Sequence, residues 1–391
     1  MMLHHILRRR NTPKKLFPIN LIGFLFSFHL SILIYINSSF LSNYFSSPMV
    51  SLIYVLGSVG SIFLFFISVH LLNWLGNRRF LEFFLVIELI SVCMLAITTS
   101  PIWLAVFFII FSSTSVLILY SLDIFLEDVS SEEKTGRIRG VYLTLGNLAV
   151  VLSPLTIALV APNGEFTHLY VVSALVLIPV FLVALYAFKN FKDGKKEVPK
   201  LPFKAWWHSN NIRRDTFVRF TLSLFYSIVV IYSPLYLRNF VGFTWTEISI
   251  IFTIMLLPFV LFEIPFGRIA DKFTGEKEIM TTGLFIMGTT LIIMPFMNKP
   301  LMIPWIIILF ASRVGASMVE VTVESYFFKH VNKNDEGLIS IFRLTQSVAY
   351  IVGPIIGALV IAFLPFEAMF FILALVMLKA MGSSSLLQDT R

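Results

Sequence analysis

Charged residues are scarce in this chain. Only 13% of its 391 residues are Asp, Glu, Lys or Arg, and 57% are hydrophobic, whereas soluble domains have about a quarter charged residues. The mean hydropathy is +0.87. So few polar residues cannot cover a water-soluble fold of this length, and the composition therefore excludes a protein whose solvent is water.

Cysteine is almost absent as well, because Cys93 is the one cysteine and it lies inside an apolar run. A single thiol excludes an internal disulfide. The sequence also lacks a nucleotide-binding glycine loop, a His or Cys cluster at metal-ligand spacing, and a Ser paired with a suitable base. It therefore predicts no catalytic residue, no metal site and no cofactor, and it argues against ATP as an energy source.

The sequence does contain apolar runs long enough to cross a bilayer, which takes about 20 residues. The first series covers 17–37, 48–72, 79–99, 101–122, 138–161 and 168–188, and the second covers 215–237, 247–267, 278–297, 301–327, 338–362 and 365–381. They predict an all-α membrane protein with twelve transmembrane helices in two pseudo-symmetric six-helix bundles. The predicted divisions are an N-terminal arm (1–16), a bundle (17–188), a central loop (189–214), a second bundle (215–381) and a C-terminal tail (382–391).

The N-terminus has a second interpretation. Arg8, Arg9 and Arg10 precede the first apolar run, as basic residues do in a secretory signal peptide. We expect an uncleaved span instead, because the run is long and no small-x-small cleavage site follows it.

The net charge of +8 comes from basic residues that lie between the spans. They fall on alternate connections, which carry Arg78, Arg79, Lys134, Arg137, Arg139, the central loop, Arg268, Lys272, Lys277, Lys329 and Lys333. Short loops rich in Lys and Arg stay in the cytoplasm, so we expect both termini to be cytoplasmic and the chain to lie in the cell membrane. This distribution between spans argues against a nucleic-acid partner.

An offset of about 200 residues brings the two series of spans into register. The turn NWLGNRR at 73–79 then aligns with ADKFTGEK at 270–277, and Pro154 aligns with Pro354. The acidic residues that also match are Asp123 and Glu127 in the first half and Glu320 and Glu324 in the second. These matches predict an internal duplication.

The segment EIPFGRIADKFTGEK at 263–277 resembles the conserved cytoplasmic motif of the major facilitator superfamily. The glycines, the Asp and the basic residues of the motif correspond to Gly267, Asp271, Lys272, Gly275 and Lys277. The first-half copy keeps Gly76, Arg78 and Arg79 but has Asn73 in place of the Asp. Together with twelve spans and the central loop, the resemblance covers nearly the whole chain.

The resemblance implies two bundles that rock about a central cavity and carry a small-molecule substrate across the membrane. In the family the Asp of this turn docks on the positive end of a neighbouring helix. By resemblance, Asp271 is expected to dock near residues 337–340, and Gly267, Lys272 and Gly275 complete a conformational latch. The alternative is an ordinary cytoplasmic turn with solvated charges. The buried Arg that is frequent in the fourth span of the family is replaced here by Ser-Ser-Thr-Ser at 112–115.

Charged side chains within spans are functional candidates, because one at mid-bilayer costs about 2.5–3.5 kcal/mol. In the tenth span Arg313, Ser317, Glu320 and Glu324 share one helix face. Arg313 is a candidate substrate contact through its planar guanidinium, and an internal salt bridge is the alternative. Glu320 is the candidate proton-coupling group, and Glu320 and Glu324 can also pair with Arg343.

His29 in the first span is a second candidate substrate contact, and a hydrogen-bonded packing role is the alternative. Glu88 in the third span is expected to pack against a neighbouring helix. The residues assigned to a charge network are Asp123, Glu127, Arg139, Glu263, Glu324 and Arg343.

These features predict a secondary active transporter of a small solute that works by alternating access, with protons as a candidate coupling ion. The expected partners are a small-molecule substrate, membrane lipid and protons, and the expected state is a monomer. A passive facilitator of the same fold is the first alternative. The second is a lipid-modifying enzyme, a scaffold or a receptor, although the outer loops have almost none of the clustered acidic or His residues that such an enzyme needs.

Overall fold

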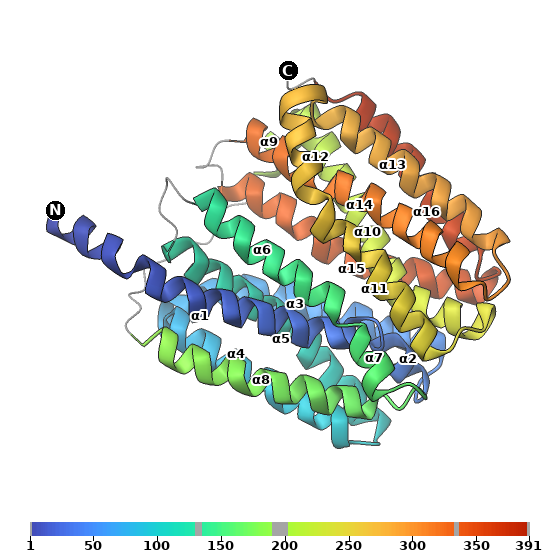
Figure 1. The fold of residues 1–391 in the computed structure, drawn as a ribbon, viewed down its shortest axis with the longest axis horizontal. Helices are drawn as coiled ribbons and strands as arrows, with labels where there is room; N and C mark the ends of the chain where they lie inside the picture. The colour runs from blue at the N-terminus through green and yellow to red at the C-terminus, as the bar shows by residue number, and fades with distance from the viewer. Residues whose placement is uncertain (1, 130–134, 190–201, 332–335, 389–391) are drawn as a thin grey trace. The chain divides into compact units, whose positions relative to one another are not determined.

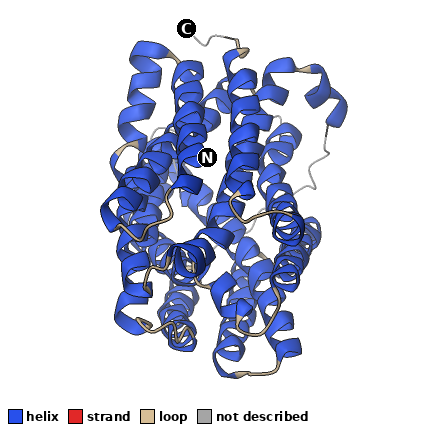
Figure 2. Ribbon diagram, turned by 90° about the vertical axis from the view of Figure 1, so that its right-hand side faces the viewer, coloured by secondary structure: helices blue, strands red, loops and turns tan. Residues whose placement is uncertain are grey.

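The computed structural model describes residues 2–129, 135–189, 202–331 and 336–388. Within these ranges every regular element is a helix (Figure 1, Figure 2). Twelve of the helical segments are long and apolar enough to cross a membrane. The predicted all-α fold with twelve spans is confirmed, and its physical basis is that a helix pairs its own backbone polar groups inside hydrocarbon.

Contacts divide the chain into two units. The first, here the N-terminal unit, holds Met1–Ile34 and Val59–Val198, and the second, the C-terminal unit, holds Tyr35–Ser58 and Pro199–Arg391. The segment Tyr35–Ser58 therefore packs with the second unit, although chain order places it in the bundle 17–188.

The N-terminal unit contains most of the first six spans (Figure 1). Its helices are α1 (Met2–Ile34), the part of α3 (Ser47–Leu75) after Ser58, α4 (Asn77–Ile97), α5 (Pro101–Val129), α6 (Thr135–Leu152), α7 (Leu155–Val160) and α8 (Thr167–Ala187). Helix α1 packs against α5, α6 and α8, and α4 packs against α5 and α8. Helices α6 and α7 form one span that is interrupted next to Pro154, because proline has no N–H group to donate to the preceding turn.

The C-terminal unit contains the other six spans. Its elements are α2 (Asn37–Ser42), the start of α3, α9 (Phe203–His208), α10 (Asn210–Tyr236), η1 (Leu237–Val241), α11 (Trp245–Leu261), α12 (Glu263–Ile269), η2 (Ala270–Thr274), α13 (Glu276–Ile293), η3 (Met294–Phe296), α14 (Met302–His330), α15 (Glu336–Phe363) and α16 (Ala368–Ser385). Helix α10 packs against α14, α15 and α16. Its apolar stretch is 83% buried, so α10 forms the centre of this unit.

Helices α13 and α14 approach each other closely at two glycines. A Cβ atom added to Gly315 would lie 2.6 Å from the carbonyl oxygen of Gly283, and a Cβ atom on Gly283 would lie 2.6 Å from the carbonyl oxygen of Gly315. No side chain fits at either position, so these glycines set the separation of the two helices.

The turns before α4 and α13 have the same geometry. Gly76 precedes α4 with φ 77°, and Gly275 precedes α13 with φ 95°. Residues with a Cβ rarely adopt such angles, so both turns require glycine. The first helical residue after each glycine is a buried polar one, Asn77 in one unit and Glu276 in the other. This shared geometry supports the duplication that the sequence predicts.

The central connection differs from the expected loop at 189–214. Residues 190–201 lie outside the described residues, but α9 and the first turn of α10 lie within the predicted loop. The Ser209 Oγ accepts a hydrogen bond of 3.4 Å from the Ile212 N–H and so caps α10. A span that is predicted from hydropathy stops at the first charged residue. The helix itself continues for as long as its backbone groups are hydrogen-bonded and its end is capped.

At both chain ends, a helix also extends beyond the predicted span. Helix α1 begins at Met2, inside the predicted arm 1–16, and α16 ends at Ser385, inside the predicted tail 382–391. Residues 389–391 of that tail lie outside the described residues.

Candidate functional site

Helices α10 and α14 bring charged side chains together inside the C-terminal unit. Arg313 on α14 is only 1% exposed. Its guanidinium lies over the ring of Phe225 on α10, 4.9 Å from the ring centroid, and against the hydroxyl of Tyr35. Among the described residues its Nη1 atom has no hydrogen-bond partner. The hydrogen-bonding capacity of this atom is therefore not used by any protein group among the described residues.

Glu320 lies two turns along α14 from Arg313 and is half-buried. Its Oε2 atom accepts a hydrogen bond of 2.7 Å from the Tyr226 hydroxyl on α10. The Arg219 guanidinium and the Glu324 carboxylate act on it electrostatically. The structure thus places the predicted coupling residue beside a hydroxyl, a cation and a second carboxylate.

Glu324 links α14 to two other helices. Its Oε1 atom accepts a hydrogen bond of 2.9 Å from Arg343 on α15 and lies 3.5 Å from a guanidinium nitrogen of Arg219 on α10. The pair with Arg343 is one that the sequence suggests. Because the Arg343 side chain is 49% exposed, we expect this pair to contribute about 1 kcal/mol or less to stability.

Asp215 is a buried acid that the sequence did not single out. It lies one turn before Arg219 on α10, its exposed fraction is 0%, and neither carboxylate oxygen has a hydrogen-bond partner among the described residues. Glu324, Arg219 and Glu276 act on it electrostatically. Hydropathy places residue 215 at the start of a span, where a charge is normally solvated. The spacing of four between Asp215 and Arg219, which puts both on one helix face, was the available signal.

Hydroxyl groups hold the segment Tyr35–Ser58 in the C-terminal unit. The Ser51 Oγ lies 2.7 Å from the Tyr232 hydroxyl on α10. The Ser58 Oγ donates a hydrogen bond of 3.1 Å to the carbonyl oxygen of Tyr350 on α15. Tyr35 packs on Phe252 of α11, with 4.8 Å between the ring centroids. These contacts explain why the segment belongs with this unit.

The latch turn consists of α12, η2 and Gly275. Asp271 is exposed in η2, and its Oδ1 accepts a hydrogen bond of 3.1 Å from Lys329 at the end of α14. Lys329 also forms an ion pair with the buried Glu276, whose Oε1 accepts a hydrogen bond of 2.8 Å from Ser325. The turn is therefore tied to α14, and docking of Asp271 at 337–340 stays a prediction.

The other residues of this motif have simpler surroundings. Lys272 is exposed, and Gly267 is half-buried with the Val321 side chain 3.4 Å from the position of a Cβ. Glu263, at the start of α12, is half-buried and acts electrostatically on Tyr226.

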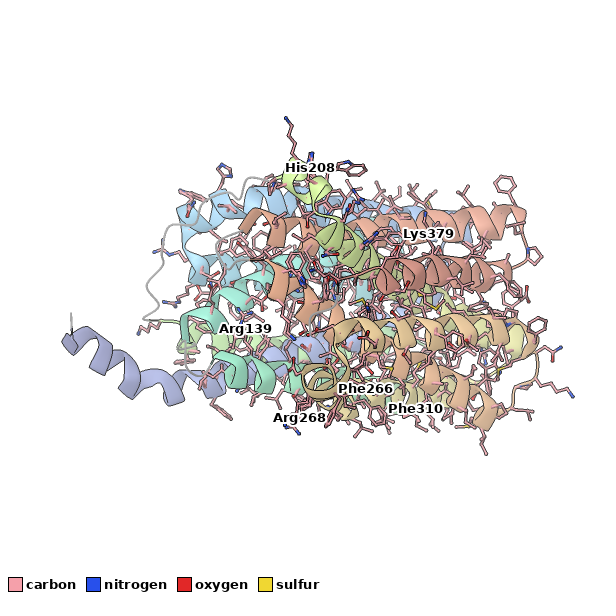
Figure 3. The ribbon with its side chains drawn as sticks, turned by 90° about the horizontal axis from the view of Figure 1, so that it is seen from above. Arg139, His208, Phe266, Arg268, Phe310 and Lys379 are labelled. Carbon is pink, nitrogen blue, oxygen red and sulfur yellow. The ribbon has the colours of Figure 1, made fainter. Side chains whose placement is uncertain are left out.

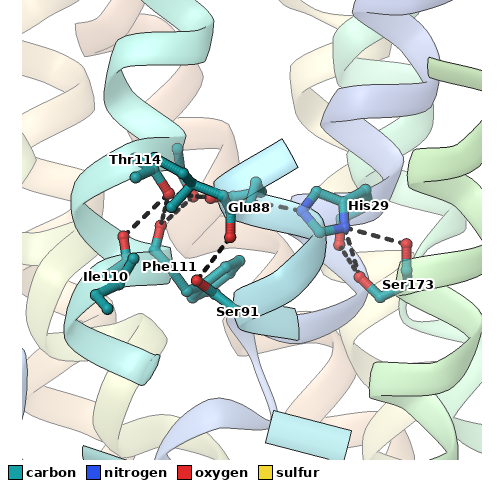
Figure 4. A network of polar contacts seen from close by, with 9 residues as sticks. His29, Glu88, Ser91, Ile110, Phe111, Thr114 and Ser173 are labelled. Carbon is teal, nitrogen blue, oxygen red and sulfur yellow. Dashed lines mark hydrogen bonds and ion pairs between the residues drawn. The ribbon is translucent and has the colours of Figure 1, made fainter. Parts of the chain in front are cut away.

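His29 and Glu88 form a separate network inside the N-terminal unit (Figure 4). Both are 0% exposed, and the His29 Nε2 lies 3.4 Å from the Glu88 Oε1. The His29 Nδ1 lies 2.6 Å from the Ser173 Oγ. Glu88 accepts hydrogen bonds from Thr114 and, at 2.6 Å, from Ser115. The structure gives both imidazole nitrogens of His29 a protein partner.

The remaining charge-network residues lie elsewhere in that unit. Asp123 and Glu127 on α5 and Arg139 on α6 are exposed, and Figure 3 shows Arg139. Asp123 acts electrostatically on the hydroxyl of the half-buried Tyr142 on α6. The structure therefore brings Glu263, Glu324 and Arg343 into the C-terminal unit and leaves the other members in the N-terminal unit.

Among the described residues, no group of three or more His, Cys, Asp or Glu side chains is arranged to hold a metal ion.

Comparisons with known proteins agree with this architecture. A family model described as Major Facilitator Superfamily matches residues 19–247 and 216–387. The nucleoside transporter NupG has a TM-score of 0.73 at 12% identity, over 95% of this chain and 98% of that one. An auto-inhibited POT family peptide transporter has a TM-score of 0.73 at 13% identity, over 97% and 98%.

A bacterial homologue of the human lysosomal transporter Spinster, in an inward-facing and unoccupied conformation, has a TM-score of 0.73 at 12% identity, over 96% of each chain. At these identities the similarity is one of fold. No curated protein matches this chain in sequence.

Proposed function

The chain belongs to the major facilitator superfamily of membrane transporters, and we propose that it is a secondary active transporter that moves a small solute by alternating access, with protons as the coupling ion. Its two-unit build with twelve spans supports this proposal.

One observation carries the proposal: a guanidinium is buried in the C-terminal unit with an N–H group that no described residue uses. Arg313 is 1% exposed, and its Nη1 is unpaired among the described residues. A buried charge whose hydrogen-bonding groups are only partly satisfied is expensive, so a structural role alone would favour its replacement by an apolar residue. A planar guanidinium binds anionic or polar groups well, and we propose that Arg313 contacts the solute.

The coupling step is assigned to Glu320. Its carboxylate accepts from Tyr226 and lies near Arg219 and Glu324, so its proton affinity depends on the placement of these three neighbours. A rearrangement of α10 against α14 would change these contacts and release or take up a proton. This is the property that a coupling group needs, because it must titrate differently in the two access states.

His29 fits a structural role better than a solute contact, since both ring nitrogens have protein partners. Arg313 is therefore the principal candidate for the solute site.

The proposal is tested by proton movement in reconstituted vesicles. Purified protein is placed in liposomes that contain a pH-sensitive dye, and nucleosides and dipeptides are supplied in turn as probe solutes. We expect a transported solute to change the internal pH and an imposed pH gradient to drive its accumulation. Glu320→Gln should abolish both the solute-induced change of internal pH and the accumulation driven by the pH gradient, while exchange of the solute continues, because glutamine cannot carry a proton.

A matched control is Glu165→Gln, since Glu165 is an exposed acid on a short connection of the N-terminal unit. This variant should behave as the wild type. If the wild-type protein moves a solute at a rate that ignores the pH gradient, coupling is refuted and the chain is a passive facilitator. If Glu320→Gln keeps the response, coupling resides in another residue, and Asp215 is the next candidate.

A further inference from the structure

A groove of about 710 Å³ opens on the C-terminal unit, lined by α9, α10, α15 and α16. Apolar side chains line much of it, with Phe217 and Phe220 from α10 and Leu344 and Val348 from α15. The side chain of Val348 is 43% exposed, so it is accessible to a molecule in the groove. An apolar surface of this kind matches a hydrocarbon chain better than a polar solute.

Three basic residues also line the groove. They are Arg213 and Arg214 at the start of α10 and Lys379 on α16, and none of the described lining residues is acidic. Arg213 donates to the Trp207 carbonyl at 2.8 Å, and Arg214 donates to the Leu386 carbonyl at 2.7 Å. Each guanidinium has five N–H groups, so donors remain for a ligand. Lys379 is exposed, and its ammonium lies 5.8 Å from the Phe217 ring centroid.

Helix α9, which forms one end of the groove, carries aromatic side chains of the kind found at the level of lipid headgroups. Its Phe203 and Trp207 side chains are 59% and 61% exposed. Trp206 lines the groove, and its indole N–H donates to the Thr216 Oγ1 at 3.2 Å. Exposed Trp and Phe next to the end of a span are typical of the membrane interface. The span that follows α9 begins at Asn210, so the apolar walls continue from this interface into the hydrocarbon.

We propose that this groove binds one anionic phospholipid. Lys379, Arg213 and Arg214 hold its phosphate-bearing headgroup, and one acyl chain lies along Phe220, Leu344 and Val348. The lipid comes from the leaflet at this end of the helices. The charge decides the class of lipid, because a lining with three cations and no acid among the described residues favours a headgroup with net negative charge over a zwitterionic one. The proposal stands independently of the transported solute.

The test measures lipid binding to the full-length purified protein. Dioleoyl phosphatidylglycerol, dioleoyl phosphatidylcholine and inorganic phosphate are titrated separately, and bound species are counted by native mass spectrometry. We expect one phosphatidylglycerol to bind more tightly than phosphatidylcholine. A basic residue near a membrane surface contributes about 1 kcal/mol, so Lys379→Gln should weaken phosphatidylglycerol binding about fivefold, and Lys379→Gln with Arg213→Gln about thirtyfold.

Two further variants make the result specific. Arg268→Gln removes the same charge at an exposed position that does not line the groove, and Figure 3 shows Arg268 on the opposite side of the view from Lys379. It should leave the affinity unchanged. Val348→Trp keeps all charges but fills the space beside the apolar side chains of the groove, so it should weaken binding of both lipids.

Four outcomes would overturn the proposal. They are equal affinities for the two lipids, displacement of phosphatidylglycerol by an equal concentration of inorganic phosphate, an unchanged affinity in the charge variants, and an equal loss in Arg268→Gln. If the double variant fails to fold, Val348→Trp decides the matter, because an unchanged phosphatidylglycerol affinity in that variant contradicts a lipid seated in the groove.

Discussion

At the scale of single residues, the buried charges differ in whether protein groups satisfy them. In the N-terminal unit, His29 and Glu88 are paired with each other and with hydroxyl groups of Thr114, Ser115 and Ser173. In the C-terminal unit, Arg313 and Asp215 keep polar atoms without partners among the described residues. Buried polar atoms are nearly always hydrogen-bonded. Arg313 and Asp215 therefore mark the part of the molecule where a ligand or proton is expected.

Arg313 gives the sharpest prediction at this scale. Arg313→Ala should weaken binding of the solute found in the vesicle assay by about 10- to 100-fold, because a hydrogen bond to a charged group contributes about 1.5–3 kcal/mol. Arg313→Lys should recover only part of this loss, since it keeps the charge but not the planar fork. Equilibrium binding to purified protein is the measurement.

Arg268→Ala serves as the control for loss of an exposed arginine. Unchanged affinity in Arg313→Ala would assign this residue to helix packing through Phe225 and Tyr35 instead.

At the scale of elements, the spans could be predicted and their ends could not. Run length alone locates each span, because a bilayer demands about 20 apolar residues of any helix that crosses it. Helix ends depend on caps and on neighbours, and neither is encoded in hydropathy. The predicted span 215–237 therefore omits the turn that begins at Asn210, and with it the burial of Asp215. Helix α9 was also missed from the sequence, because a helix of six residues is too short to show a helical period in its hydrophobic residues.

The turn between α12 and α13 carries the element-scale prediction. Asp271→Asn should slow transport while leaving folding intact, because the ion pair with Lys329 is exposed and contributes about 1 kcal/mol or less to stability. The initial rate of solute uptake in vesicles is the measurement, and size-exclusion chromatography reports folding. Glu165→Gln is again the control. A normal rate in Asp271→Asn would exclude a latch role for the turn.

At the scale of the whole molecule, the orientation in the membrane is a prediction from the basic connections. In a Cys93→Ala background, single cysteines are introduced as Asn43→Cys, Thr274→Cys and Gln388→Cys, all at exposed positions. A membrane-impermeant maleimide added to intact cells should label only Asn43→Cys, since the other two sites are predicted to be cytoplasmic. Labelling of Thr274→Cys or Gln388→Cys before permeabilisation would refute the orientation.

The sequence by itself determined the solvent, the number of spans and the family, because these follow from the total length of apolar runs and from one turn motif with its glycines. It also located the stripe of Arg313, Ser317, Glu320 and Glu324, since a spacing of four, three and four is visible along the chain. Only the tertiary structure decided what each of these side chains meets. In helices that are apolar on every face, the pattern does not reveal which face turns toward which neighbour, so pairing depends on helix rotation and close packing. For that reason Tyr226 beside Glu320, the unpaired Asp215, and the segment Tyr35–Ser58 packed on α10 and α15 became apparent only in three dimensions.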